Sequence, residues 1–169
     1  ILHVLTLDQP HQEIRLSVRG LVEITDEDGE DADQRLSPLV FTRMTELTHP
    51  DEALLELAHR HAGLPVDARL EALSETILSA MPFTPGVTDV ASNAAEAYRG
   101  GYGVCQDHTH VFLACCRALG LPARYVSGYL YSQDSEHVAS HAWAEVWQDG
   151  SWHTFDVTNQ TRLPRHHLK

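Results

Sequence analysis

The spacing of the apolar residues changes along this chain, and that change constrains the fold more than any other feature. Between residues 50 and 119 apolar side chains recur at helical spacing, as in Leu70, Leu73 and Ile77. Beyond residue 123 the apolar stretches are short, and Asp149 followed by Gly150 is a strong signal for a two-residue hairpin turn. Helices followed by an antiparallel sheet are typical of the α+β class.

This pattern predicts four helices and three strands. The predicted helices cover residues 50–62, 67–80, 93–98 and 105–119. The predicted strands cover residues 123–131, 140–148 and 151–157, with a polar loop at 132–139. Residues 36–47 show no clear period and are interpreted as a linker. Residues 1–7 and 12–24 predict a further hairpin, which needs a larger body to pack against because two strands alone are marginally stable.

Charge and composition exclude several classes of function. The 169 residues suit one domain, and 24 acidic against 12 basic residues give a net charge of −12. Such a chain lacks the basic face that a sequence-independent nucleic-acid binder needs. No apolar run approaches the length of about 18 residues that a membrane helix requires. Three cysteines cannot all pair within one chain, so we expect a reducing, cytoplasmic location, with an export signal before Ile1 left open.

One of these cysteines, Cys105, stands where a thiol can become a nucleophile. It follows the glycine-rich stretch 100–103 and begins a predicted helix. The partial positive charge at a helix N-terminus favours the thiolate, and free N–H groups there can hold an oxyanion. Cys115 and Cys116 fall inside the same helix among apolar residues, and we assign them to the core.

A base for the thiol follows from the register of the predicted hairpin. With a two-residue turn at 149–150, Trp143 faces Asp156, and His141 lies diagonal to Asp156 on the same face. The two backbones are then about 5–8 Å apart, which allows a side-chain hydrogen bond. A carboxylate that holds one imidazole nitrogen leaves the other free to act as a base. A three-residue turn would break this arrangement, so the prediction depends on the turn length.

Four sequence blocks resemble the core of the transglutaminase-like superfamily. They are GVCQD at 103–107, RALGLPARYVSGYL at 117–130, HAWAEVW at 141–147 and WHTFDVTN at 152–159. The resemblance covers about residues 47–162 and keeps the family's order and separations. More narrowly, the blocks are similar to bacterial proteins described as transglutaminase-like enzymes or cysteine proteases.

The resemblance implies a papain-like α+β fold in which the helix of the nucleophile packs against an antiparallel sheet. It implies Cys105 as nucleophile, His141 as general base and acid, and Asp156 as the orienting carboxylate. It also implies that residues 1–36 are the C-terminal part of a small, truncated β domain. Residues 37–169 are then the catalytic core without its last strands.

The expected chemistry is acyl transfer from a carboxamide or peptide bond through a thioester on Cys105. Resolution by water gives a protease or an amidase, and resolution by an amine gives a transglutaminase. Tyr102 and Trp143 are the candidate substrate-binding residues. The expected partner is a protein, a peptide or a small amide, with no cofactor, no metal and no nucleic acid. The oligomeric state stays open.

Two other classes of function stay open. A catalytically silent member with the same fold would act as an interaction module. A zinc protein would use some of the 12 histidines, although the chain lacks the paired spacing that structural zinc usually shows. The candidate ligands are Cys105, His108 and His110, with His59, His61, His166 and His167 as additions. His108, one helical turn from Cys105, is also a competing partner for the thiolate.

Overall fold

The computed structural model describes residues 36–131, 140–162 and 166–169, together with the isolated positions 6, 10, 12–14 and 23. Apart from those isolated positions, the predicted N-terminal hairpin lies outside the described residues. The same holds for the polar loop at 132–139. The proposed β domain before residue 37 therefore stays a prediction.

Helices form the first part of the described chain, as the helical spacing of apolar residues predicts. They are η1 (Pro38–Thr42), η2 (Glu46–Thr48), α1 (Glu52–His59), α2 (Val66–Ala80), α3 (Ala94–Gly100) and α4 (Cys105–Ala118). The predicted linker thus contains two short 3₁₀ helices, which are too short to show a hydrophobic period. Helix α1 begins later than predicted because Asp51 caps it, accepting a hydrogen bond from the Leu54 N–H at 3.0 Å, and it ends at His59, before a turn at residues 60–63.

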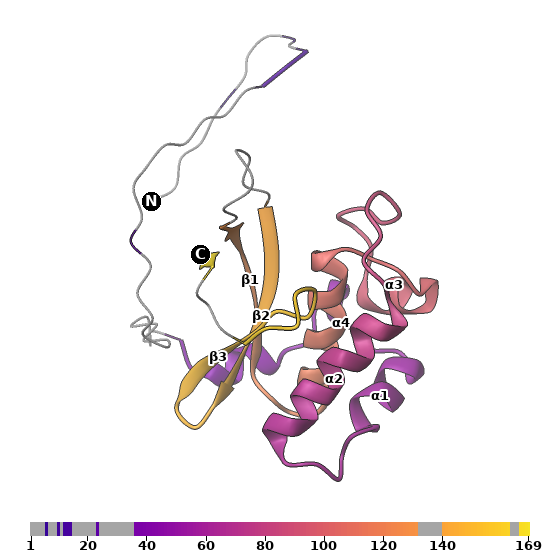
Figure 1. Ribbon diagram of the computed structural model, residues 1–169, viewed down its shortest axis with the longest axis vertical. Coiled ribbons are helices and arrows are strands. Elements are labelled where there is room, and N and C mark those ends of the chain that lie inside the picture. The colour runs from indigo at the N-terminus through magenta and orange to yellow at the C-terminus, as the bar shows by residue number, and fades with distance from the viewer. Residues whose placement is uncertain are drawn as a thin grey trace.

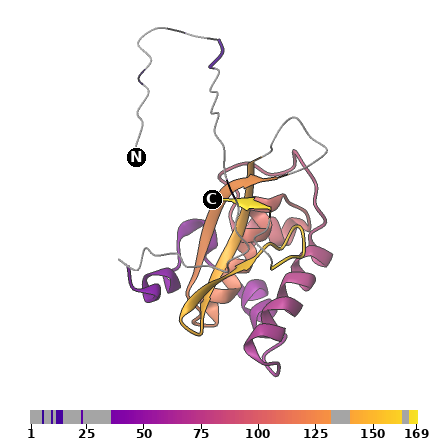
Figure 2. The same ribbon diagram turned by 60° about the vertical axis from the view of Figure 1, so that its left-hand side comes forward.

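The second part forms an antiparallel sheet with the strand order β3-β2-β1-β4 (Figure 1). The strands are β1 (Ala123–Leu130), β2 (Ser140–Gln148), β3 (Ser151–Phe155) and β4 (His167–Leu168). Trp147 pairs with Trp152 across the hairpin, which confirms the two-residue turn and hence the predicted register. Strand β4, yellow in Figure 2, was not predicted and pairs with the end of β1.

Helix α4 lies at the centre of the fold, with α1, α2 and α3 on one side and the sheet on the other (Figure 1). Its Phe112 packs against Phe155 of β3, with ring centroids 5.3 Å apart. Cys115 and Cys116 are fully buried in this core, as predicted. Burial raises the pKa of Cys115 to about 12, so this thiol stays protonated. The arrangement of helices on an antiparallel sheet is the expected α+β fold.

The described helices also bear on the question of a membrane segment. None of the helices in the described ranges combines the length and the hydropathy that crossing a bilayer requires.

Candidate active site

Cys105 is the first residue of α4, and the loop before it is shaped around Asp107. The Asp107 carboxylate accepts hydrogen bonds from the Val104 N–H at 2.8 Å and from the Thr88 hydroxyl at 2.7 Å. Gly103 packs so closely on this side chain that a Cβ there would lie 2.7 Å from the Asp107 Cβ. The glycine before the helix is therefore required by space, and Asp107 fixes the turn that presents Cys105.

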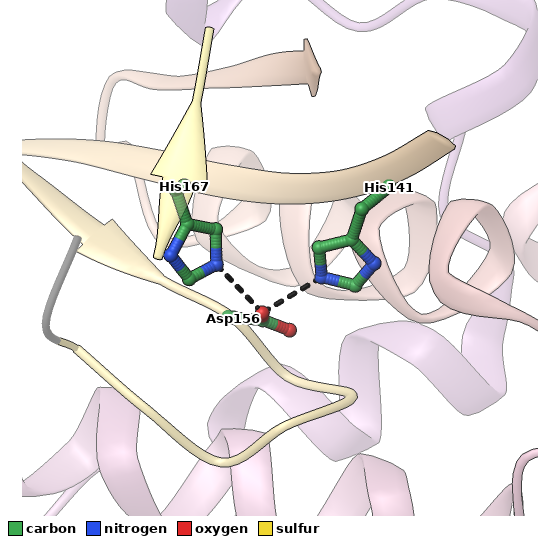
Figure 3. Close-up of side chains that lie close together, drawn as sticks. All are labelled: His141, Asp156 and His167. Atoms are coloured by element: carbon green, nitrogen blue, oxygen red, sulfur yellow. Dashed lines mark hydrogen bonds and ion pairs between the residues drawn. The ribbon is translucent and has the colours of Figure 1, made fainter. Parts of the chain in front are cut away.

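His141 and Asp156 meet as the hairpin register predicts. His141 projects from β2 and Asp156 follows β3, and both side chains are buried. The Nε2 atom of His141 donates a hydrogen bond to the Oδ2 atom of Asp156 at 2.7 Å (Figure 3). This contact leaves the Nδ1 atom of His141 available to another partner.

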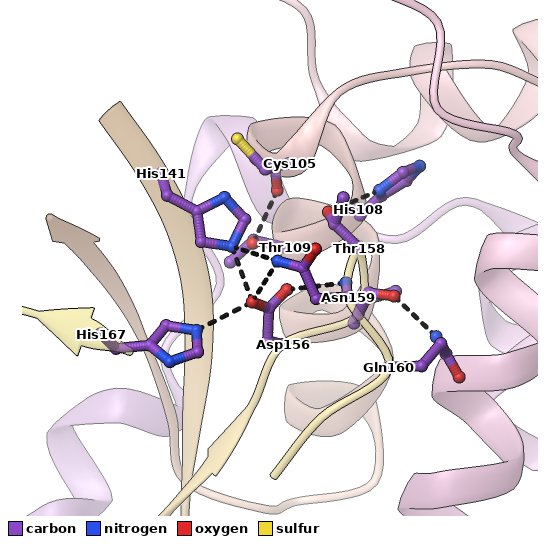
Figure 4. A network of polar contacts seen from close by, with 10 residues as sticks. Cys105, His108, Thr109, His141, Asp156, Thr158, Asn159, Gln160 and His167 are labelled. Atoms are coloured by element: carbon purple, nitrogen blue, oxygen red, sulfur yellow. Dashed lines mark hydrogen bonds and ion pairs between the residues drawn. The ribbon is translucent and has the colours of Figure 1, made fainter. Parts of the chain in front are cut away.

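Cys105 lies beside the His141 ring, on the side away from Asp156 (Figure 4). Burial disfavours the thiolate, but the hydrogen bonds from His141 and the Ala142 N–H, with the charge of His141, hold the pKa of Cys105 below its usual value. Burial likewise opposes the charge on His141, but Asp156 and Cys105 raise the pKa of His141 to about 9. Both shifts act in the direction of a thiolate beside an imidazolium.

Two residues that the sequence analysis missed complete the surroundings of Asp156. His167 donates from Nε2 to Oδ2 at 2.8 Å, and Asn159 donates from Nδ2 to the same oxygen at 2.8 Å. The backbone N–H of Asn159 donates to Oδ1 at 3.1 Å. Burial opposes the charged form, but hydrogen bonds from His141, His167 and Asn159 hold the pKa of Asp156 far below its usual value. The carboxylate is thus ionised and fixed from several sides.

The two candidate substrate-binding residues have different surroundings. Trp143 is fully buried, so it offers no surface to a substrate and does not line a cleft. Its ring stacks against His141 with centroids 6.0 Å apart and meets the edge of His167 at 4.7 Å. Trp143 therefore supports the imidazole from behind, which corrects its expected role. Tyr102 is 41% exposed beside the loop that leads to Cys105, and its role stays a prediction.

His108 does not compete for the thiol. Its Nε2 atom donates to the Met81 carbonyl at 2.8 Å, and its Nδ1 atom accepts from the Thr158 hydroxyl at 2.9 Å. Both ring nitrogens are therefore occupied within the core. Burial lowers the pKa of His108, which keeps the ring neutral.

The cluster of possible metal ligands within the described residues differs from the expected one. It consists of His141, Asp156 and His167, whose ligand atoms lie within 4.8 Å of one another (Figure 3). Two imidazoles that donate to one carboxylate oxygen account for this closeness by hydrogen bonding alone. The predicted group of Cys105, His108 and His110 does not appear as a cluster among the described residues.

The sequence profile of the transglutaminase-like superfamily matches residues 55–157. This range includes α4 and the first three strands, and with them Cys105, His141 and Asp156. The match covers more than half of the chain. The chain therefore belongs to the transglutaminase-like superfamily.

Two solved bacterial structures resemble this fold. One is a protein from Cytophaga hutchinsonii described as a "Putative Cysteine Protease", with a TM-score of 0.67, 27% identity and coverage of 82% of this chain and 47% of that chain. The other is the periplasmic domain of TgpA from Pseudomonas aeruginosa bound to ethylmercury. Its TM-score is 0.54, with 25% identity over 73% of this chain and 49% of that domain's chain.

Mycobacterial proteins are similar in sequence. An uncharacterized protein of Mycobacterium leprae is 29% identical over 185 residues, which cover 96% of this chain and 64% of the relative. An uncharacterized protein of Mycobacterium tuberculosis H37Rv is 33% identical over 116 residues, or 62% of this chain and 37% of the relative. The chain thus spans less than two thirds of the length of these relatives.

Proposed function

We propose that this chain is the catalytic core of a cysteine-dependent enzyme that transfers acyl groups from carboxamide or peptide bonds. The observation that carries the proposal is the alignment of Cys105, His141 and Asp156, in which His141 donates to Asp156 and, from beside Cys105, lowers the pKa of its thiol. Each member comes from a different element, and the polar surroundings shift the pKa of each toward the charged form. Such coupled shifts are typical of sites where a nucleophile and a base act together.

In the first step the Cys105 thiolate attacks the carbonyl carbon of the amide, and the electrons of the C=O bond move to oxygen. The Cys105 N–H lies in the first turn of α4, where a helix provides no acceptor, so it suits the developing oxyanion. The oxyanion then collapses, the C–N bond breaks, and the leaving nitrogen takes the proton from Nδ1 of His141. The products are an acyl-thioester and a free amine or ammonia.

In the second step neutral His141 takes a proton from water or from an amine, which attacks the thioester carbon. The C–S bond breaks, the thiolate returns, and the product is an acid or a new amide. Asp156 accepts the hydrogen bond from Nε2 throughout and stabilises the imidazolium that forms. The description of the Cytophaga hutchinsonii protein supports hydrolysis as the first activity to assay.

The test measures the release of ammonia, and of new amino groups from cleaved peptide bonds, by the full chain acting on a glutamine-rich protein and on short peptide amides, with and without an added primary amine. We expect release in the unaltered chain and loss of release in Cys105→Ala. Incorporation of the amine would identify transamidation, and release without incorporation would identify hydrolysis. The matched control is Cys116→Ala, because Cys116 is fully buried and its pKa is raised well above the usual value.

Two results would contradict the proposed function. Release that persists in Cys105→Ala would exclude thiol catalysis. No release from any substrate, together with a Cys105 thiol no more reactive than a free cysteine, would favour the interaction module.

A further inference from the structure

A hollow of about 380 Å³ lies along α4, beside the catalytic residues and separate from them. Among the residues that line this hollow, those with polar side chains are Thr45, Thr48, Gln106, His110, Arg117 and Tyr125. We call this set the α4 subsite. Gln106, His110 and Arg117 fall on one face of α4, so the subsite follows the helix for about 16 Å from the residue after the nucleophile to the last turn.

The charge of the α4 subsite is opposite to that of the chain. The chain has a net charge of −12, yet none of the described residues that line the hollow is acidic, and Arg117 is among them. Arg117 donates to the Thr48 hydroxyl at 2.7 Å and to the carbonyls of Ala123 at 2.9 Å and Phe41 at 3.1 Å. These partners are neutral, so the positive charge has no counterion within the described part of the chain.

Two arginines elsewhere in the described chain are paired with acids, whereas Arg69, which donates to carbonyls, lies outside the hollow. Arg124 pairs with Glu145 at 2.6 Å, and Arg162 pairs with Asp67 at 3.1 Å. A guanidinium held only by neutral oxygens keeps N–H groups that suit a carboxylate. The hollow therefore offers a positive site in a chain that is otherwise strongly acidic.

His110 forms part of the wall of the hollow. Its side chain is only 6% exposed, and its Nδ1 atom is buried without a hydrogen-bond partner among the described residues. The ring lies beneath Tyr125, with centroids 5.3 Å apart.

The same tyrosine links the α4 subsite to the nucleophile. Gln106, which follows Cys105 in the chain, lines the hollow with Tyr125. Burial, with the negative charges of Cys105 and Asp107, raises the pKa of Tyr125. Leu47, Val90 and Leu113 line the rest of the hollow, so an aliphatic stem can lie between its polar ends. A ligand in the hollow would thus extend from the thiol toward Arg117.

We propose that the α4 subsite binds an acyl substrate that carries a carboxylate at the far end of an aliphatic chain, long enough to reach from Cys105 to the last turn of α4. The carboxylate contacts Arg117, the aliphatic part lies on Leu47 and Leu113, and the carbonyl reaches Cys105. This inference rests on the proposed function and adds the chemical class of its substrate, an acidic amide or peptide.

The test uses two N-substituted iodoacetamides with the same aliphatic chain, one ending in a carboxylate and the other in a carboxamide. Each rate of Cys105 alkylation is divided by the rate with iodoacetamide itself in the same variant. We expect the carboxylate reagent to react about tenfold faster than its neutral twin, as one charge-assisted hydrogen bond allows. High salt should reduce the preference, Arg117→Gln should abolish it, and Arg117→Lys should keep part of it. Arg162→Gln is the matched control and should keep the preference, because Arg162 pairs with Asp67 and Glu71 away from the hollow.

Arg117 also joins η1 to the start of β1, so its replacement removes contacts that hold the fold. A second measurement therefore uses the unaltered chain. Dodecanedioate, which is long enough to span the hollow, should slow the alkylation of Cys105 by iodoacetamide in a saturable way, and its neutral diamide should not. Equal rates for the two tailed reagents, or equal effects of the dicarboxylate and its diamide, would overturn the α4 subsite while Cys105 stays selectively reactive. A Cys105 that iodoacetamide does not alkylate selectively would instead overturn the proposed function.

Discussion

His167 donates a hydrogen bond from Nε2 to the Oδ2 atom of Asp156 at 2.8 Å. The same oxygen accepts the hydrogen bond from His141 at 2.7 Å (Figure 4). One carboxylate oxygen thus accepts from two imidazoles, of which His141 lies beside Cys105. The position of the His141 imidazole therefore depends on a residue of β4, at the far edge of the sheet.

Replacement of His167 tests this dependence. His167→Ala removes a donor to Asp156, so the pKa of Asp156 should rise and the acid limb of the activity profile should move to higher pH. Loss of the buried contact should also cost about 1–3 kcal/mol in the free energy of unfolding. Urea unfolding and a pH profile of ammonia release measure the two effects. His166→Ala is the matched control, since His166 is an exposed neighbour, and a change of equal size in both variants would contradict this role for His167.

Replacement of Asp156 tests whether its negative charge controls the protonation of His141 and Cys105. Asp156→Asn removes the negative charge that raises the pKa of His141 to about 9, so the thiolate at Cys105 loses its stabilising imidazolium. We expect the pKa of Cys105, read from the pH dependence of iodoacetamide alkylation, to rise toward its usual value. Catalytic activity should fall by about 10⁴-fold, as in other triads that lose this charge. An unchanged alkylation profile would show that Asp156 does not act on the thiol.

The hairpin shows how much of this site local sequence rules can predict. Side chains alternate across a strand, and a two-residue turn fixes which residues face each other, so the meeting of His141 and Asp156 follows from the Asp149-Gly150 signal. The helix that begins at Cys105 follows likewise from a glycine-rich loop and a helical period. These features depend on neighbours in the sequence, and the structure confirms them.

Features that depend on β4 could not be predicted in this way. Two residues are too few to show an alternating pattern, so neither β4 nor the place of His167 has a local signal. The same strand explains the incorrect role for Trp143, because His167 packs on its ring and helps to close it off from solvent. Asn159 lies in the WHTFDVTN block, three residues after Asp156, but its contact requires the turn that only the folded chain defines.

The dependence of stability on pH follows from the same two groups. The pKa of His141 is raised from 6.5 to about 9, so its contribution is fully present below pH 6.5 and is lost as pH rises through 9. The pKa of Asp156 is lowered from 3.8, so its contribution is present above that pH and is lost as pH falls below it. We expect both contributions between about pH 4 and 6.5. Urea unfolding from pH 3 to 10 should show this plateau in the unaltered chain and a smaller decline on both sides in Asp156→Asn. Parallel curves for the two proteins would contradict the assignment.

A last prediction concerns Gly128 of β1, where β4 and Trp143 come closest. A Cβ on Gly128 would lie 2.0 Å from the Leu168 carbonyl oxygen and 2.9 Å from the Cη2 atom of Trp143, so backbone must shift. Gly128→Ala should displace β4 and with it the His167 contact to Asp156, at a cost of about 1–3 kcal/mol in the free energy of unfolding. The pH profile of activity should change in the same direction as in His167→Ala. Gly63→Ala is the control, because a Cβ there meets no atom within 4 Å and should leave stability equal or slightly higher. If Gly128→Ala unfolded like Gly63→Ala and kept the original pH profile, β4 would have no part in holding the carboxylate.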